Sequence, residues 1–171
     1  MTAPKAPDPL ADSAPFEEMP ATEAPLVLTF PTTPDRSLTP NRTKGKHWRR
    51  ISPARKVERD AVCWIVRGDH QGRYGVGGRP DPLTGPLRVE VLIRWGKAWM
   101  TGEKRTRYEQ VRPVDQDAAA ALMKAWFDGI TDAKTVWVDD RQIRTLIVRQ
   151  SIDESGYGET IITITSEGTT T

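Results

Sequence analysis

The sequence of 171 residues predicts an α+β domain in which a small mixed β-sheet packs against two main helices. Short apolar segments with strand character alternate with segments of helical period, and no regular βαβ repeat is present. The chain is 37% hydrophobic and 28% charged, a composition that allows one core of modest size. One domain is therefore expected.

The two ends of the chain differ in composition from the middle. Residues 1–25 contain six prolines, six alanines and five acidic residues with one lysine, and they have no apolar period. Such a segment buries too little surface to offset the entropy of ordering it. We predict a disordered tail over residues 1–25, a folded domain over 26–166 and a flexible tail over 167–171.

Composition also limits the kinds of site. A single cysteine, Cys63, excludes disulfide frameworks and zinc sites built on paired cysteines, and two histidines exclude a multi-histidine cage. Any metal would therefore need oxygen ligands, which suit a hard cation. No apolar run is long enough to span a membrane and no secretory signal is present, so we expect a cytoplasmic protein.

The first half of the domain shows one strand and one helix. Leu26–Phe30 has strand character and is closed by Pro31. Ser52 followed by Pro53 predicts a helix start, and this helix is expected to end by Gly68. Its expected buried face consists of Val57, Ala61, Trp64 and Ile65.

Later segments complete the sheet. After a Gly- and Pro-rich loop over 72–86, alternation over 87–94 predicts a strand, and residues 97–112 lead into another. A helix capped by Asp117 is expected over 118–130. We predict a short strand over 136–138, then two strands over 143–148 and 161–164 joined as a hairpin.

A basic segment precedes and enters the first helix. From Arg36 to Arg59 there are nine Lys or Arg residues, and Glu58 is the only acidic one. This block favours a phosphate backbone as partner, although a solvated helix face with a basic loop is the plainer interpretation. We expect Trp48, Trp64 and Trp126 to be packing residues.

Acidic residues gather at the ends of two predicted elements. Asp115 and Asp117 start a helix, and Asp139 with Asp140 ends a strand. Carboxylates that converge from separate elements suit Mg²⁺. Lys124 follows Asp117 by seven residues, about 700° of helix and about 20° from two full turns, so both lie on one face.

Each of these residues also has a structural interpretation. Asp128 lies four residues after Lys124, where an ion pair would hold the lysine without a metal. Asp117 can cap its helix, and Asp139 with Asp140 can form a polar turn. The residues leave these alternatives open, but the joint clustering of acids beside a lysine favours a site.

Four blocks follow one another between residues 26 and 165. They are Leu38–Arg42 with His47–Arg49, the Asp-x-Asp pattern in Arg112–Asp117, the Lys and Asp-Gly helix Lys124–Ile130, and the Asp-Asp-x-Gln pattern in Val138–Ile143. In these blocks the chain resembles the RusA-type Holliday junction resolvases of bacteria and their phages. The resemblance covers nearly the whole chain outside its tails.

The resemblance implies a RusA-like fold, a homodimer and an origin in a bacterium or phage. It also implies a specific enzymatic function. The function is a Mg²⁺-dependent, structure-specific DNA endonuclease that resolves four-way junctions by paired phosphodiester hydrolysis in recombination and repair. It implies catalytic roles for Asp115, Asp117, Lys124 and Asp140. The three aspartates would be the metal ligands, with Asp139 as a further candidate and Mn²⁺ as a substitute ion.

With this function, the basic segment would hold DNA backbones. The expected DNA-binding residues are Arg42, Lys44, Lys46, Arg49, Arg55, Lys56 and Arg59. A second basic patch is expected at Lys104, Arg105 and Arg107.

Two features depart from the family pattern. Ala118 stands where asparagine usually follows the Asp-x-Asp motif, and the spacing to Lys124 is seven rather than four. Three extra residues rotate the lysine by about 300°, which keeps it near the aspartate's face. The alternative function is a catalytically weakened branched-DNA-binding protein, whose site the alanine would have degraded.

Overall fold

The computed structural model describes residues 24–45, 48–75, 81–101, 106–154 and 156–167. They form a mixed α+β fold, as predicted. The helices are α1 (Pro40–Thr43), α2 (Trp48–Tyr74) and α3 (Gln116–Ala133), with the 3₁₀ turns η1 (Arg36–Leu38) and η2 (Asp140–Gln142). The strands are β1 (Leu26–Phe30), β2 (Leu87–Trp95), β3 (Lys97–Thr101), β4 (Thr106–Gln110), β5 (Ile143–Ile152) and β6 (Glu159–Ser166).

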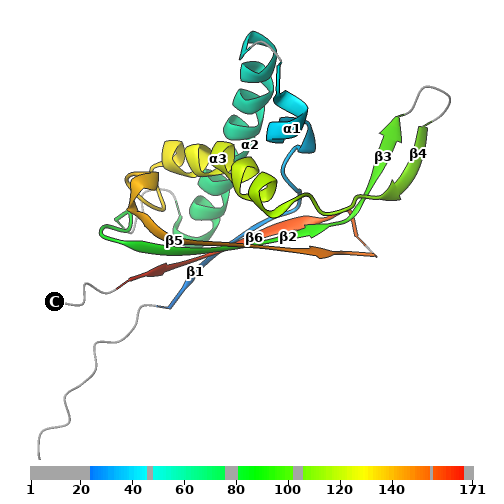
Figure 1. The fold of residues 1–171 in the computed structure, drawn as a ribbon. Coiled ribbons are helices and arrows are strands. Elements are labelled where there is room, and N and C mark those ends of the chain that lie inside the picture. Colours follow the sequence, from blue (N-terminus) through cyan, green and yellow to red (C-terminus); the bar gives the residue numbers. More distant parts are fainter. Residues whose placement is uncertain (1–23, 46–47, 76–80, 102–105, 155, 168–171) are drawn as a thin grey trace, which may run out of the picture.

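Four strands form one mixed sheet in the order β1-β6-β2-β5. Strand β6 is antiparallel to both of its neighbours, and β2 runs parallel to β5. Helices α2 and α3 lie over the same face of this sheet (Figure 1). Strands β3 and β4 pair separately as a hairpin that projects beyond the end of β2 (Figure 1).

The core lies between the sheet and helix α3. Alternate residues of β2, from Leu87 to Trp95, are buried, as a strand with one apolar face requires. They pack with the buried face of α3, which includes Leu122, Met123, Trp126 and Ile130. Trp126 is a packing residue, as expected. The core thus fixes α3 on the sheet and points its other face outward.

Helix α2 differs from the prediction in its bounds and its buried face. It begins before Pro53, which lies inside it, and continues through Gly68 to Tyr74. Val62 and Val66 are buried, whereas Val57 and Trp64 are 69% and 72% exposed, so the expected buried face and the expected packing role of Trp64 are wrong. Apolar residues occupy more than one face of this helix, so periodicity alone did not indicate which face meets α3. The side chain of Trp48 lies outside the described residues.

The predicted hairpin between the last two strands is wrong. Strand β2 lies between β5 and β6, so these two strands are not neighbours. The predicted strand over 136–138 is also absent from the described structure, and Trp137 forms only a single bridge with Leu83. The wrong hairpin has a clear cause: the chain returns from β2 through α3 to a parallel β5, a long-range pairing that local patterns do not encode.

The predicted tails and the predicted absence of a membrane span concern the whole chain. Residues 1–23 and 168–171, which hold most of both predicted tails, lie outside the described residues. None of the described helices is long and apolar enough to cross a membrane.

Candidate functional site

The Asp-x-Asp motif lies at the N-terminus of α3. The helix begins at Gln116 with Asp115 as its N-cap residue, not at Ala118 with Asp117 as cap. The Asp115 side chain makes no capping hydrogen bond, and both carboxylates are exposed. Acidic side chains here interact favourably with the helix dipole. Both carboxylates therefore lie at the helix end, and the Asp115 side chain accepts no capping hydrogen bond from the backbone there.

The Asp-Asp-x-Gln motif forms η2, just before β5. Asp139 Oδ1 accepts a hydrogen bond of 2.8 Å from Arg141 N. Gln142 completes a capping box, because its Oε1 accepts from the backbone N–H groups of Val138 and Asp139, at 2.9 Å each. This turn fixes the backbone beneath Asp140.

Gln142 also ties this turn to the loop before β2. Its Nε2 donates to Leu83 O at 2.9 Å and to Gly85 O at 3.1 Å. One side chain thus makes four backbone hydrogen bonds. Sequence reasoning placed Gln142 in a motif without giving it a role, because its partners at 83 and 85 are distant in sequence.

Lys124 joins the helix motif to the Asp-Asp motif. Its Nζ lies 2.5 Å from Asp140 Oδ2 and 2.9 Å from Asp128 Oδ1. The bond to Asp140, then that to Asp128, raises the pKa of Lys124, and the lysine is the largest cause that lowers the pKa of Asp140. The predicted i,i+4 pair of Lys124 with Asp128 is confirmed, and the lysine is held between two carboxylates.

The four predicted acidic residues occupy two places. Asp139 and Asp140 adjoin Lys124, whereas Asp115 and Asp117 lie at the start of α3, about two turns or 10 Å along the helix from the lysine. In the described parts of the chain, no three His, Cys, Asp or Glu residues lie close enough to hold a metal. The donor chemistry fits Mg²⁺, since every candidate ligand is a carboxylate.

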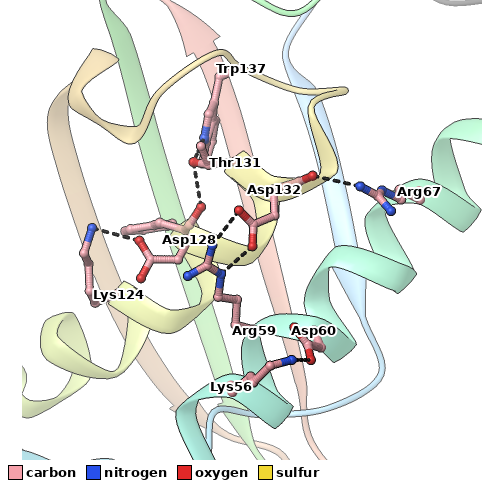
Figure 2. A network of polar contacts seen from close by, with 10 residues as sticks. Lys56, Arg59, Asp60, Arg67, Lys124, Asp128, Thr131, Asp132 and Trp137 are labelled. Carbon is pink, nitrogen blue, oxygen red and sulfur yellow. Dashed lines mark hydrogen bonds and ion pairs between the residues drawn. The ribbon is translucent and has the colours of Figure 1, made fainter. Parts of the chain in front are cut away.

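A groove of about 1010 Å³ lies between α2 and α3. Its basic lining residues are Arg55, Lys56, Arg59 and Lys124. Most of them have acidic partners within the fold, as Figure 2 shows for Lys56 with Asp60 and for Arg59 with Asp132. Arg55 is exposed, and no ion pair joins it to another described residue. The groove is therefore largely balanced in charge.

Arg59 has a structural partner that its sequence position did not reveal. Its Nη2 donates to Asp132 Oδ1 at 2.6 Å, and its Nε contacts the other carboxylate oxygen. This bond raises the pKa of Arg59 and lowers that of Asp132. Arg67 Nη2 donates to the carbonyl of Asp132 at 3.0 Å (Figure 2). Two arginines of α2 thus bind the C-terminal part of α3.

The remaining predicted DNA-binding residues lie near the start of α2. Arg42 is in α1, Lys44 follows it, and Arg49 is in the first turn of α2. All three are exposed. Lys46, Lys104 and Arg105 lie outside the described residues, and Arg107 occupies β4. Whether these residues bind DNA stays a prediction.

A smaller cleft of about 230 Å³ lies beside the N-terminus of α3. Its lining includes Arg36, Thr39, Asn41, Arg42, Asp115 and Ala118. The Arg36 guanidinium lies over the ring of Trp95, 5.7 Å from its centroid. Burial, and then the charge of Arg42, lowers the pKa of Arg36. In the sequence Arg36 is only the start of a basic run, because its contact with Trp95 is long-range.

Two comparisons with known proteins were made. The scan against protein-family models gave no match to this chain, and the search of curated proteins gave none either.

Proposed function

We propose that this protein is a Mg²⁺-dependent, structure-specific DNA endonuclease that resolves four-way junctions, as the resemblance to RusA-type resolvases implies. The observation that carries the proposal is the contact of Lys124 with Asp140, at 2.5 Å. It joins the Lys and Asp-Gly block to the Asp-Asp-x-Gln block, and the two contacting residues lie 16 positions apart in the sequence. Lys124 therefore lies next to the acidic pair Asp139 and Asp140. It belongs to α3, the helix that starts with the Asp-x-Asp motif.

In this proposal Asp115, Asp117 and Asp140 would be the Mg²⁺ ligands and Asp139 a further one. This requires the start of α3 and the η2 turn either to come closer together than in this structure or to hold one ion each. When bound, the ion supplies an activated water and neutralises charge on the phosphate. Lys124 donates to a phosphate oxygen, where its charge stabilises the transition state. Asp128 and Asp140 hold the lysine in position and keep it protonated over a wide pH range.

DNA binding in this proposal relies on exposed basic residues. Arg42, Lys44 and Arg55 form no ion pair with another described residue, and Arg49 is exposed in the first turn of α2. The charges of these four side chains suit them to backbone phosphates. A four-way junction has approximate two-fold symmetry, so a homodimer with two equivalent sites would make one cut in each of two strands.

The test is cleavage of a synthetic four-way junction and a matched linear duplex, each with Mg²⁺, with Mn²⁺ and with chelator. We expect paired nicks in the junction with either ion. Asp117→Asn and Asp140→Asn should abolish cleavage and leave junction binding largely intact, because both residues act on the metal. Lys124→Met should slow cleavage by removing a charge-stabilising donor.

Asp81→Asn is the matched control, since Asp81 is exposed and lines a different cleft beside β1. It should cleave like the wild type. Full activity in Asp140→Asn would remove that residue from the site. Tight junction binding without cleavage under any divalent ion would instead favour the branched-DNA-binding protein, with Ala118→Asn as the first variant to make.

A further inference from the structure

We propose that the cleft between Arg36 and Arg42 binds one backbone phosphate of the DNA, next to the cleavage site. The inference rests on the proposed function and adds a residue, Arg36, and a location to it. Arg36 and Arg42 line one cleft of about 230 Å³, together with Asn41. Arginine presents a fork of donors that matches phosphate oxygens.

Arg36 and Arg42 lack an ion-pair partner in the described structure. Neither Arg36 nor Arg42 forms an ion pair within the described ranges, although Asp115 lines the same cleft. Arg36 Nε is buried and has no hydrogen-bond partner among those residues. A partly desolvated cation without a partner is costly, and two cations at one cleft repel each other. An anion bound between them would offset both costs.

Arg36 is held in place by its neighbours. Its guanidinium lies over Trp95, a fully buried ring. Its backbone is fixed as well, because Asp35 caps η1 and the Thr39 hydroxyl donates to the Arg36 carbonyl at 3.1 Å. A pre-oriented donor loses little entropy when it binds a ligand. This distinguishes Arg36 from the exposed lysines of the basic segment.

The position of the cleft also favours an anion. It adjoins the N-terminus of α3, where the first-turn amides donate no hydrogen bond to the Asp115 side chain. These amides add partial positive charge. A water molecule takes about 30 Å³, so the cleft has room for a phosphate group and some of its hydration. Asp115 lines the same cleft and opposes an anion, but its single negative charge leaves the two arginines with a net positive charge of one.

The experiment uses the full-length protein labelled with ¹⁵N. The arginine Nε–H signals are followed by NMR, in chelator, during titration with inorganic phosphate and separately with the diester dimethyl phosphate. We expect saturable shifts of the Arg36 and Arg42 signals with both probes, and no shift of Arg149. Arg149 pairs with Leu92 on the opposite face of the sheet and serves as the matched control.

Junction binding gives a second readout. The double variant Arg36→Gln, Arg42→Gln should bind the junction more weakly, and the slope of log Kd against log salt should decrease by about one, the value for one lost phosphate contact. Arg149→Gln should leave the slope unchanged. Arg36→Lys and Arg42→Lys keep the charge and should recover only part of the affinity, because an ammonium lacks the fork of donors.

The outcomes separate this inference from the proposed function. Junction cleavage with silent arginine signals and an unchanged salt slope would overturn the phosphate site and leave the endonuclease. Shifted arginine signals in a protein that neither binds nor cuts junctions would support an anion site and contradict the endonuclease. A response to inorganic phosphate but not to the diester would overturn the assignment to a DNA backbone and indicate a free or terminal phosphate.

Discussion

At the scale of single residues, Gln142 connects the structure to the proposed chemistry. Its four backbone hydrogen bonds hold the turn that carries Asp139 and Asp140 against the loop before β2. Removing them leaves backbone donors and acceptors without partners. Gln142 is therefore a positioning residue, because its side chain acts through the backbone of the turn that carries Asp139 and Asp140.

We predict that Gln142→Ala lowers the free energy of unfolding by about 1–3 kcal/mol, the cost of unsatisfied polar groups. It should also raise the Mg²⁺ concentration needed for half-maximal cleavage, because Asp140 is no longer fixed. Urea unfolding and a Mg²⁺ titration of cleavage test the two effects. Gln71→Ala, an exposed site on α2, is the control. An unchanged Mg²⁺ requirement would limit Gln142 to a structural role.

Glu58 supplies a prediction about pH. Its Oε1 accepts from Trp126 Nε1 and from the backbone N–H of Asp35, both at 2.8 Å, while Oε2 is buried and has no partner in the described structure. Burial raises the pKa of this carboxyl. The native state therefore binds a proton more readily than the unfolded chain does. The folded state loses stability as pH rises from the unfolded pKa, about 4.3, through the higher native pKa.

Glu58→Gln keeps an acceptor oxygen and removes the titration. We predict that its free energy of unfolding, relative to that of the wild type, is larger at pH 7 than at pH 4. Urea unfolding of both proteins at the two pH values measures this difference. Parallel changes in both proteins would contradict the prediction. Glu58→Ala should be destabilised at both values, since Trp126 Nε1 loses its acceptor.

At the scale of elements, the contact between α2 and α3 depends on a glycine. A Cβ atom at Gly129 would lie 2.5 Å from the carbonyl oxygen of Arg59 and 3.0 Å from Val62 Cβ. The two helices therefore approach as closely as they do because residue 129 has no side chain. The same approach allows Arg59 to reach Asp132.

We predict that Gly129→Ala destabilises the protein by about 1–3 kcal/mol, the usual cost of overpacking, even though alanine favours a helix by about 1 kcal/mol. Gly68→Ala is the matched control. It lies inside α2, and its Cβ would meet nothing within 4 Å, so only the helix preference remains. Thermal unfolding should show the two substitutions shifting Tm in opposite directions. Equal shifts would mean that α2 and α3 can move apart freely.

The sequence predicts elements well where a pattern is local. The alternation in β2 and the lysine–aspartate spacing in α3 are both found in the structure. It predicts poorly where the outcome depends on a distant partner. The buried face of α2 is chosen by contact with α3 near Gly129, and β5 is separated from β6 by β2. For the candidate site, local spacing indicated Lys124 and Asp140, whereas Arg36 and Gln142 required the fold.

At the scale of the whole molecule, charge is distributed unevenly along the helical layer. The large α2–α3 groove is balanced by ion pairs that hold the fold together. The small cleft at the start of α3 has two arginines without an acidic partner in the described chain. A net charge of +2 conceals this difference. DNA affinity is therefore expected to depend more on the small cleft and the exposed residues near α1 than on the groove.

The last prediction concerns how many chains act on one junction. Each chain has one Lys124–Asp140 contact, so paired cuts need two chains. We predict a homodimer in solution, measured by sedimentation, in which each site cuts one strand. When wild type and Asp140→Asn are mixed and refolded together, mixed dimers should nick one strand and leave the junction unresolved. A junction with its two candidate strands labelled at different ends distinguishes single from paired nicks. Paired cuts by isolated mixed dimers would mean that one site acts twice, and the assignment of one site to each strand would then be wrong.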